Sequence, residues 1–218
     1  AMHICEPMRE APGGILLTGY DTLTMGDDST LVGMLDMAIF KRARAAAREL
    51  IETNDPGFIC FSVHCRTLEV ADARRRLTKL LERSKPEERK LFTAQLAGLP
   101  VGAPSQRILY GVSFLRRYTR AVLVQVPLAQ THFDKLIGSG ASGVVCRPGF
   151  GNALTARDTK HIVRFGEQAR HAGLMPLASG LHDRTAVEAA VGAGITKLSG
   201  DAIRAPTGRP HGVRPFSP

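Results

Sequence analysis

The sequence predicts an α/β protein built as a closed (β/α)8 barrel, and three observations support this prediction. Eight short apolar runs, mostly separated by segments with helical spacing, match the element count of such a barrel. With 218 residues and a hydrophobic content of 44%, the chain can bury one core of this size. The first two runs are joined by the short turn "APGG", which cannot make a parallel crossover, so one strand near the N-terminus should run antiparallel to its neighbour.

The predicted strands are each too short and too apolar to be surface helices. They cover residues 3–7, 14–20, 58–63, 90–96, 121–126, 143–147, 175–178 and 195–198. The predicted helices cover residues 29–53, 67–84, 108–118, 133–137, 158–172 and the segment around 186–190. Ser29 can cap the first helix, whose apolar stripe consists of Leu31, Leu35, Ile39, Ala43, Ala46 and Leu50.

Residues 1–203 are therefore predicted to form one barrel domain, and residues 204–218 a separate tail. The tail is rich in Pro, Gly and Arg, so it cannot form a packed element and should be extended or disordered. The first residues, "AMH", resemble a cloning remnant joined to a strand. We therefore expect the chain to be the C-terminal part of a longer protein.

The formal net charge of +9 is compatible with an acidic partner, although solvated helix faces account for most such charge. The composition argues against nucleic acid, because the chain has no Trp and only three Tyr on which bases could stack. The cationic clusters are Arg74 to Arg76, Arg116 with Arg117 and Arg120, and Arg204, Arg209 and Arg214 in the tail. No apolar run reaches the roughly 18 residues of a membrane span.

The four cysteines, Cys5, Cys60, Cys65 and Cys146, are scattered along the chain without a C-x-x-C pair. This spacing argues against a disulfide framework and against a structural zinc site. We therefore expect a reducing, cytoplasmic setting and no cofactor.

The order of motifs along the chain resembles the EAL domain of bacterial cyclic di-GMP phosphodiesterases. The segment "HICEPMREAPGGILLTGYDTL" is similar to the family's opening hairpin, with Pro7, Gly14 and Gly19 in register. "LDMAIFKRA" and "FSVHCRTL" resemble the motifs that follow it, and residues 171–206 are similar to the family's ending. The resemblance spans about residues 3–206 and implies a TIM-like (β/α)8 barrel of EAL type, a family whose barrel also has an antiparallel strand.

The resemblance also implies where chemistry would occur, and at those positions this sequence departs from the family. Active EAL domains hold two divalent metals with acidic and amide side chains at the strand ends, and a lysine assists. Here the motif glutamate corresponds to Asp21 and the phosphate-binding arginine to Met25. The positions that we expect to form a vestigial site at the barrel mouth are Glu6, Asp21, Met25, His64, Thr93, Gln125, Val126, Cys146, Ser179 and Ser199.

One shortened carboxylate cannot replace a set of charged oxygen ligands, so we expect no catalytic residue, no metal and no phosphodiesterase activity. The connection "TMGDDST" is also shorter than the lobe that covers the nucleotide in the family, so cyclic di-GMP binding should be weak or absent. The predicted role is a regulatory or protein-interaction module in bacterial signalling. Family members pair through the later half of the barrel, which implies that a partner or a second copy contacts residues 131–151 and the helix that follows.

Three alternatives stay open: a phosphate-binding enzyme site, a zinc site and a metal-free site for cyclic di-GMP. Gly180 and Gly200 follow the last two strands and resemble the phosphate cradle of phosphate-binding barrel enzymes. The acid–base groups that such an enzyme could use are Glu6, Asp21, His64 and Lys197. A zinc site could use Glu6, Asp21, His64 and Cys146. The barrel could also bind cyclic di-GMP without metal.

Structural roles explain the same residues without chemistry. His64 fits a hydrogen-bonded residue at a strand end, and Cys146 fits a small buried hydrophobe. Ser179 and Ser199 fit small polar fillers. Lys197 precedes an inward-facing leucine, so its side chain should face solvent or the helix layer rather than form a Schiff base.

Overall fold

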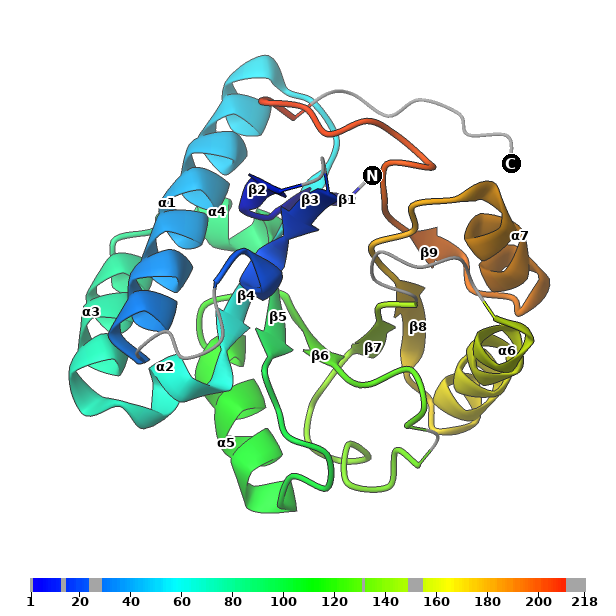
Figure 1. Ribbon diagram of the computed structural model, residues 1–218. Helices are drawn as coiled ribbons and strands as arrows, with labels where there is room; N and C mark the ends of the chain where they lie inside the picture. Colours follow the sequence, from blue (N-terminus) through cyan, green and yellow to red (C-terminus); the bar gives the residue numbers. More distant parts are fainter. Residues whose placement is uncertain (1, 13–14, 24–28, 131, 149–154, 211–218) are drawn as a thin grey trace. The chain divides into compact units, whose positions relative to one another are not determined.

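The computed structural model describes residues 2–12, 15–23, 29–130, 132–148 and 155–210 (Figure 1). Met25 and Arg214 lie outside these residues, as do both ends of the predicted contact segment, Thr131 and Gly151. In the part of the chain that is described, no helix is long and apolar enough to cross a membrane.

Seven strands form one sheet with the hydrogen-bonded order β1-β4-β5-β6-β7-β8-β9. The pairs β1–β4, β4–β5, β6–β7, β7–β8 and β8–β9 are all parallel. The bounds are β1 Met2–Cys5, β4 Phe58–His64, β5 Phe92–Ala97, β6 Ala121–Gln125, β7 Gly143–Cys146, β8 Met175–Ala178 and β9 Lys197–Leu198. The predicted α/β class is confirmed, and each of the eight predicted strands is present, one of them outside this sheet.

The N-terminal hairpin differs from the prediction in its partners. Strand β3 (Ile15–Thr18) pairs antiparallel with β2 (Met8–Ala11) in a separate two-stranded sheet, and not with the first strand. β1 instead pairs in parallel with β4. Pro7 lies between β1 and β2 and has no N–H for a sheet hydrogen bond, which explains why the chain leaves the large sheet there.

The helices are α1 Ser29–Thr53, α2 Cys65–Glu69, α3 Ala71–Glu82, α4 Pro86–Leu91, α5 Ser105–Arg116, α6 Ala156–His171 and α7 Arg184–Gly192. The predicted helix over 67–84 is divided at Val70, whose backbone is extended. The sequence analysis missed α4, although Pro86 at its first position is a helix-start signal. The predicted helix over 133–137 is wrong, because residues 134–140 form turns in which Gly138 and Gly140 have positive φ values of 76° and 85°.

Four of the six residues in the predicted stripe of α1 are buried: Ile39, Ala43, Ala46 and Leu50. Leu31 is 43% exposed, whereas Val32, Phe40 and Ala47 are buried. Asp36 lies on the buried face and is 0% exposed. A carboxyl group in this position needs hydrogen-bond partners, since burial without them is costly.

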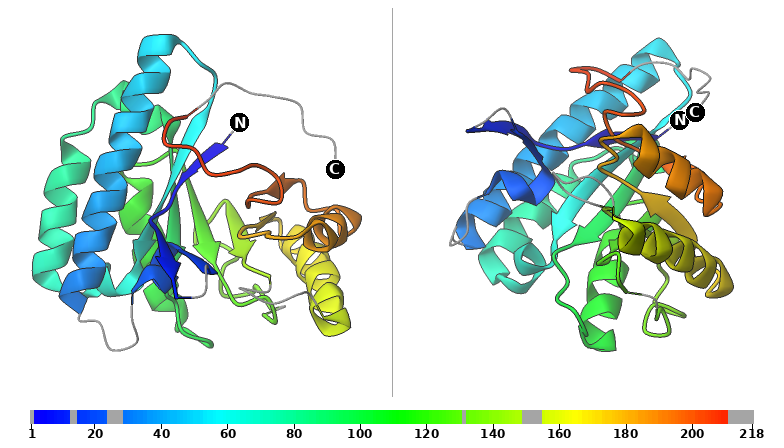
Figure 2. Two further views of the ribbon diagram at one scale, coloured as in Figure 1. Left: turned by 45° about the horizontal axis from the view of Figure 1, so that its top comes forward. Right: turned by 45° about the vertical axis from the view of Figure 1, so that its right-hand side comes forward.

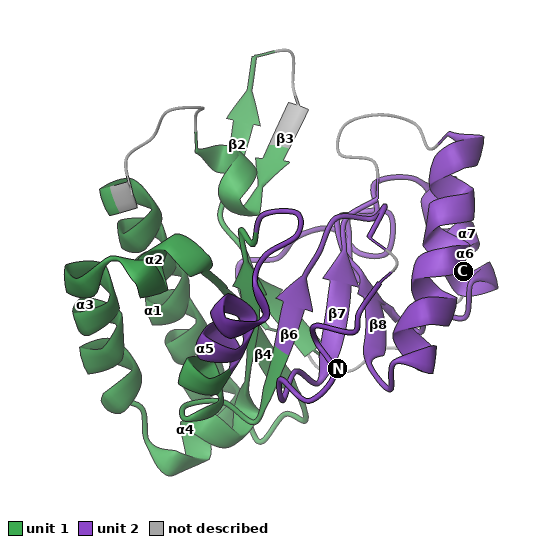
Figure 3. Cartoon of the chain, turned by 90° about the horizontal axis from the view of Figure 1, so that it is seen from below, with its two compact units in different colours: residues 1–99, 113–122, 209–213 green, residues 100–112, 123–208, 214–218 purple. Residues whose placement is uncertain are grey.

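The chain divides into two compact units, which we describe separately (Figure 3). Unit 1 comprises residues 1–99, 113–122 and 209–213, and unit 2 comprises residues 100–112, 123–208 and 214–218. In unit 1, α1 packs against β4 and lies beside α3 (Figure 2). Phe40, Phe61 and Phe92 meet edge to face in its core, with ring centroids 5.0–5.6 Å apart. In unit 2, Phe133 and Phe165 make a similar contact at 5.6 Å.

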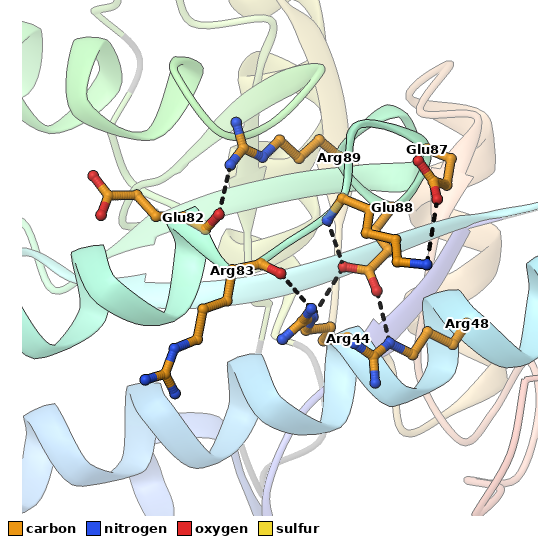
Figure 4. Close-up of polar contacts among 8 residues, drawn as sticks. Arg44, Arg48, Glu82, Arg83, Glu87, Glu88 and Arg89 are labelled. Atoms are coloured by element: carbon orange, nitrogen blue, oxygen red, sulfur yellow. Dashed lines mark hydrogen bonds and ion pairs between the residues drawn. The ribbon is translucent and has the colours of Figure 1, made fainter.

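A buried carboxylate joins α1 to α4 in unit 1 (Figure 4). The Glu88 side chain is 1% exposed and accepts hydrogen bonds from Arg44 Nε at 2.9 Å and Arg48 Nε at 2.7 Å. The backbone N–H of Lys85 donates to the same carboxylate at 3.0 Å. Burial alone would raise the pKa of Glu88, but these hydrogen bonds outweigh burial and lower it.

We therefore expect Glu88→Gln to lower the free energy of unfolding by about 2 kcal/mol, because it leaves two arginines without a charged acceptor. The matched control is Glu87→Gln, whose carboxylate is exposed and lies 3.9 Å from Lys85 Nζ. This control should change the free energy by less than about 0.5 kcal/mol. Urea denaturation of both variants measures the difference, and equal losses would contradict the role given to Glu88.

Candidate functional site

Most of the predicted site residues lie where parallel strands end. In unit 1, Glu6 follows β1, His64 ends β4, and Asp21 lies in the short 3-10 helix η1 (Gly19–Thr22) after β3. In unit 2, the residues at the ends of β6, β7, β8 and β9 are Gln125 with Val126, Cys146, Ser179 and Ser199. Each unit therefore has its own group of predicted site residues at its strand ends.

Thr93 is the exception among the described positions. It is the second residue of β5 and pairs in register with Cys60, whereas His64 pairs with Ala97 at the other end of the strand. Thr93 is 6% exposed and lies inside a strand that is buried along its whole length. The expectation that Thr93 lies at the mouth is therefore corrected, because the strand register places Ala97 at that edge.

The main polar network of unit 1 is centred on Asp36, which the sequence analysis did not single out. Tyr20 Oη lies 2.5 Å from Asp36 Oδ1, and the backbone N–H of His64 donates to Asp36 Oδ2 at 2.9 Å. The carboxyl group thus connects η1, α1 and the end of β4. The three elements carry two of the predicted positions, Asp21 and His64, so this network fixes the backbone that bears them.

Burial has the largest effect on the pKa values of Asp36 and Tyr20 in this network. Removal of Asp36 from water raises the pKa of its carboxyl to about 7, although hydrogen bonds from Tyr20 and the His64 N–H act in the opposite direction. Burial, together with the neighbouring Asp36, also raises the pKa of Tyr20 well above its usual value. Tyr20 is therefore a neutral hydrogen-bonding group, and Asp36 titrates near neutrality.

His64 has the structural role that we predicted as an alternative to chemistry, that of a hydrogen-bonded residue at a strand end. Its Nδ1 accepts a hydrogen bond from the backbone N–H of Arg66 at 3.2 Å and so caps α2. Its ring meets the Tyr20 ring edge to face, with centroids 4.9 Å apart. A methyl group on Gly98 would lie 1.9 Å from His64 Nε2, so the ring occupies the space that this glycine leaves open.

The cysteines are poor ligands and nucleophiles in this structure. Burial raises the pKa of Cys146 to about 12 and that of Cys5 to about 11. Cys146 is 0% exposed, which agrees with its interpretation as a small buried hydrophobe. Zinc binds the thiolate, so a neutral buried thiol does not favour the zinc alternative. Within the described residues, no three His, Cys, Asp or Glu side chains are grouped closely enough to hold a metal ion.

Close packing explains why position 200 in unit 2 is a glycine. A Cβ on Gly200 would lie 2.1 Å from the backbone oxygen of Leu181, because the loops after β8 and β9 cross closely there. The N–H of Leu181 donates to Ser199 O at 3.1 Å, and the N–H of Ala202 donates to Leu181 O at 3.1 Å. The absence of a side chain at Gly200 is therefore explained by the contact between two loops, without a phosphate.

Charged residues that the sequence analysis did not select gather near Gly180. A Cβ on Gly180 would lie 3.4 Å from Arg147 Nε and 3.7 Å from His182 Nε2. His182 Nδ1 lies 2.6 Å from Asp201 Oδ1. Arg147, His182 and Asp201 follow β7, β8 and β9, so they share the carboxyl edge of unit 2 with Ser179 and Ser199.

The environments of Ser179, Ser199 and Lys197 do not indicate a catalytic role. Ser179 is 4% exposed, and within the described part of the chain its Oγ makes no hydrogen bond. Ser199 is half-buried, and its backbone N–H donates to Ala178 O at 2.9 Å. Lys197 is exposed, as predicted, so it does not sit in the desolvated pocket that a Schiff-base lysine requires.

Sequence patterns could have revealed part of what was missed. Asp36 occupies a buried position of an apolar helix face, which is a recognisable signal for a buried polar network. Arg147 is the last residue of a predicted strand, and His182 and Asp201 stand four and three residues after predicted strands, so their place on the carboxyl edge could be predicted. The contact between His182 and Asp201 could not, because it depends on how the two loops cross.

Comparison with known proteins finds similarity of structure only. No family model and no curated protein sequence matches this chain. A solved structure described as the PaMucR phosphodiesterase in complex with c-di-GMP superposes with a TM-score of 0.71 at 14% identity, over 91% of this chain and 82% of that one. The FimX EAL domain from Pseudomonas aeruginosa, bound to c-di-GMP, gives a TM-score of 0.63 at 11% identity, over 92% and 81% of the two chains.

Larger proteins match over part of their length. The Vibrio cholerae LapD fragment with an S helix, a GGDEF and an EAL domain matches with a TM-score of 0.62 at 13% identity, over 91% of this chain. This chain covers 48% of that fragment and 48% of the Bacillus subtilis YkuI protein, so it spans about half of their length. The fold described here is therefore that of an EAL domain.

The titration of Asp36 gives a prediction for stability against pH. The carboxyl keeps its proton up to about pH 7 in the folded state, whereas the ordinary pKa of an aspartate, 3.8, applies in the unfolded chain. The folded state therefore binds more protons between these values, and stability should fall as pH rises from about 4 to about 7, with a limiting slope of about 1.4 kcal/mol per pH unit.

Asp36→Asn mimics the protonated carboxyl, since its amide can donate to Tyr20 Oη and its oxygen can accept from the His64 N–H. The variant should lose this part of the pH dependence. Free energies of unfolding from urea titrations at pH 5, 6 and 7 measure it. An unchanged slope in the variant would show that another group titrates.

Proposed function

We propose that this chain is an EAL-type domain without phosphodiesterase activity that acts as a regulatory, protein-binding module in bacterial cyclic di-GMP signalling. The observation that carries the proposal is the chemistry of the strand ends. In unit 2 they present Gln125, Val126, Cys146, Ser179 and Ser199, none of which is a carboxylate. Hard divalent cations require charged oxygen ligands, so these residues do not support two-metal hydrolysis.

The environment of the remaining groups supports the same proposal. The thiol of Cys146 is neutral at physiological pH because burial raises its pKa to about 12. His64 is engaged by the Arg66 N–H through Nδ1 and packs against Tyr20. Asp21 is exposed on η1. The environment of each of these three side chains is that of a residue in a folded, non-catalytic domain.

The connection between the N-terminal hairpin and α1 is also short. η1 ends at Thr22 and α1 begins at Ser29, so only residues 23–28 join them. A segment of this length has no room for an additional folded lobe over a nucleotide. This favours a domain that binds cyclic di-GMP weakly or not at all.

A metal-free receptor for cyclic di-GMP is the second candidate, and one observation favours it. The Arg147 guanidinium lies beside Gly180 on the carboxyl edge of unit 2, where an anionic ligand could be held by charge-assisted hydrogen bonds. Several solved EAL domains of similar fold are described as bound to c-di-GMP. The receptor candidate differs from the main proposal in requiring saturable nucleotide binding.

The first test of the proposal is hydrolysis. Purified protein with Mg²⁺ or Mn²⁺ should not convert cyclic di-GMP to a linear product, because Glu6 and Asp21 are the only carboxylates among the predicted strand-end positions and two carboxylates cannot replace the full set of ligands for two metals. Chromatographic separation of the nucleotides measures turnover, with Asp21→Asn as the matched variant. Turnover that this substitution abolishes would refute the proposal.

The second test separates the two candidates by calorimetry with cyclic di-GMP, with and without metal. The main proposal expects no saturable heat in the low micromolar range. If saturable binding is found, Arg147→Ala should abolish it, whereas Arg184→Ala, which removes an exposed arginine paired with Glu188, should not. Binding with that pattern of variants would establish the receptor function in place of the main proposal.

A further inference from the structure

A dense group of cations precedes strands β5 and β6, in two segments that belong to unit 1. The segments 83–90 and 116–120 contain seven Arg and Lys and only two acidic residues. They lead directly into β5 and β6, and Arg120 N–H donates to Phe92 O at 3.0 Å. We call this surface the basic face: Arg83, Lys85, Arg89, Lys90, Arg116, Arg117 and Arg120.

The two acidic residues do not neutralise the basic face. Glu88 is buried and already accepts from Arg44 and Arg48, which lie on α1 and are not part of the face. Glu87 is exposed and lies 3.9 Å from Lys85 Nζ, a loose pair. The positive charge of the face is therefore available to solvent.

Three of the five arginines of the basic face lie against aromatic rings. Arg120 Cζ lies 3.9 Å from the centroid of the Phe58 ring. Arg117 Cζ and Arg89 Cζ lie 5.6 Å and 5.7 Å from the centroid of the Tyr118 ring. Arg89 Nη2 also donates to Glu82 O at 3.0 Å. A guanidinium held over a ring leaves donors at its edge, so the exposed Arg117 and Arg120 are preorganised to bind oxyanions, whereas Arg89 is half-buried and already donates to Glu82 O.

We propose that the basic face is a docking surface for an acidic segment of a partner protein. This inference rests on the proposed protein-binding function and names the surface and the chemistry of the partner. Carboxylates can form bidentate pairs with the guanidinium edges, and prior ordering of the arginines lowers the entropy cost of these pairs.

The rings that order the arginines argue against nucleic acid on this surface. Single-stranded nucleic acid binds by stacking its bases on exposed aromatic side chains. Tyr118 is 4% exposed, and the Phe58 side chain, which is 38% exposed, has Arg120 Cζ 3.9 Å from its ring centroid. The surface therefore offers one partly exposed ring and no row of rings on which successive bases could stack.

The composition of the face also argues against a membrane. Peripheral membrane segments combine cations with apolar side chains that enter the lipid. Segments 83–90 and 116–120 expose no large apolar side chain, and Phe58, the 38% exposed ring beside them, lies under the Arg120 guanidinium. An acidic polypeptide needs only the charges and hydrogen-bond donors that the face supplies.

The test uses a fluorescently labelled peptide rich in Glu and Asp, measured by anisotropy against the whole chain at low and at physiological salt. The peptide should bind, and the affinity should fall with salt. The double variant Arg117→Glu with Arg120→Glu should weaken binding by about tenfold or more, which corresponds to about 1.4 kcal/mol.

The matched control carries the same change of charge on α3. Arg75→Glu with Arg76→Glu removes two exposed cations that lie beside Asp72 in unit 1 and should leave the affinity within about twofold. Because Arg120 packs on Phe58, a second variant, Lys90→Glu with Arg116→Glu, reverses exposed charges without removing a stacked arginine. It should weaken binding as well.

Three outcomes would overturn the inference. The first is no binding of the acidic peptide, and the second is an equal loss in the α3 control. The third is tighter binding to single-stranded DNA of equal charge or to phosphatidylserine vesicles than to the peptide. The hydrolysis assay is independent of these outcomes, because turnover would refute the proposed function while the peptide titration would still decide the role of the basic face.

Discussion

Parallel strand pairing is the constraint on which the remaining features depend. When strands run in parallel, every carboxyl end lies on one edge of the sheet and every amino end lies on the opposite edge. In unit 2 this rule brings Arg147, Ser179 and Asp201 to one edge. In unit 1 it brings the segments before β5 and β6 to the amino edge, where the basic face lies.

The second constraint is the burial of Asp36. Its carboxyl group holds η1, α1 and the end of β4 together through Tyr20 and the backbone N–H of His64. A buried carboxyl is costly when charged, and here the raised pKa reduces the cost by allowing a proton to stay. Stability near neutral pH therefore depends on a group that sits beside the strand end of the candidate site.

The carboxyl edge and the amino edge differ in what their side chains can do. At the carboxyl edge of unit 2, the predicted positions are filled by amide, hydroxyl, thiol and aliphatic groups, and the thiol is neutral. At the amino edge of unit 1, guanidinium groups are stacked on rings and face solvent. The carboxyl edge of unit 2 therefore has few reactive side chains, whereas the amino edge of unit 1 carries ordered cations. Both features support the proposed binding function.

The sequence by itself determined the class of fold and much of the strand-end composition. Apolar runs with helical spacing between them are local signals, so the parallel strands and α1 could be predicted to within a few residues. The same signals failed at α4 and in the turns after Phe133, where capping and a glycine with positive φ decide a short element. The partners of the N-terminal hairpin also could not be predicted, since pairing is a long-range choice.

Only the tertiary structure decided which side chains meet. The register of β5 moved Thr93 away from the strand end, and the packing of α1 buried Asp36 and left Leu31 exposed. The contact of His182 with Asp201 and that of Arg89 with the Tyr118 ring join residues that are far apart in the chain. A sequence pattern reports the period of one element, whereas these contacts depend on the rotation and register of two elements against each other.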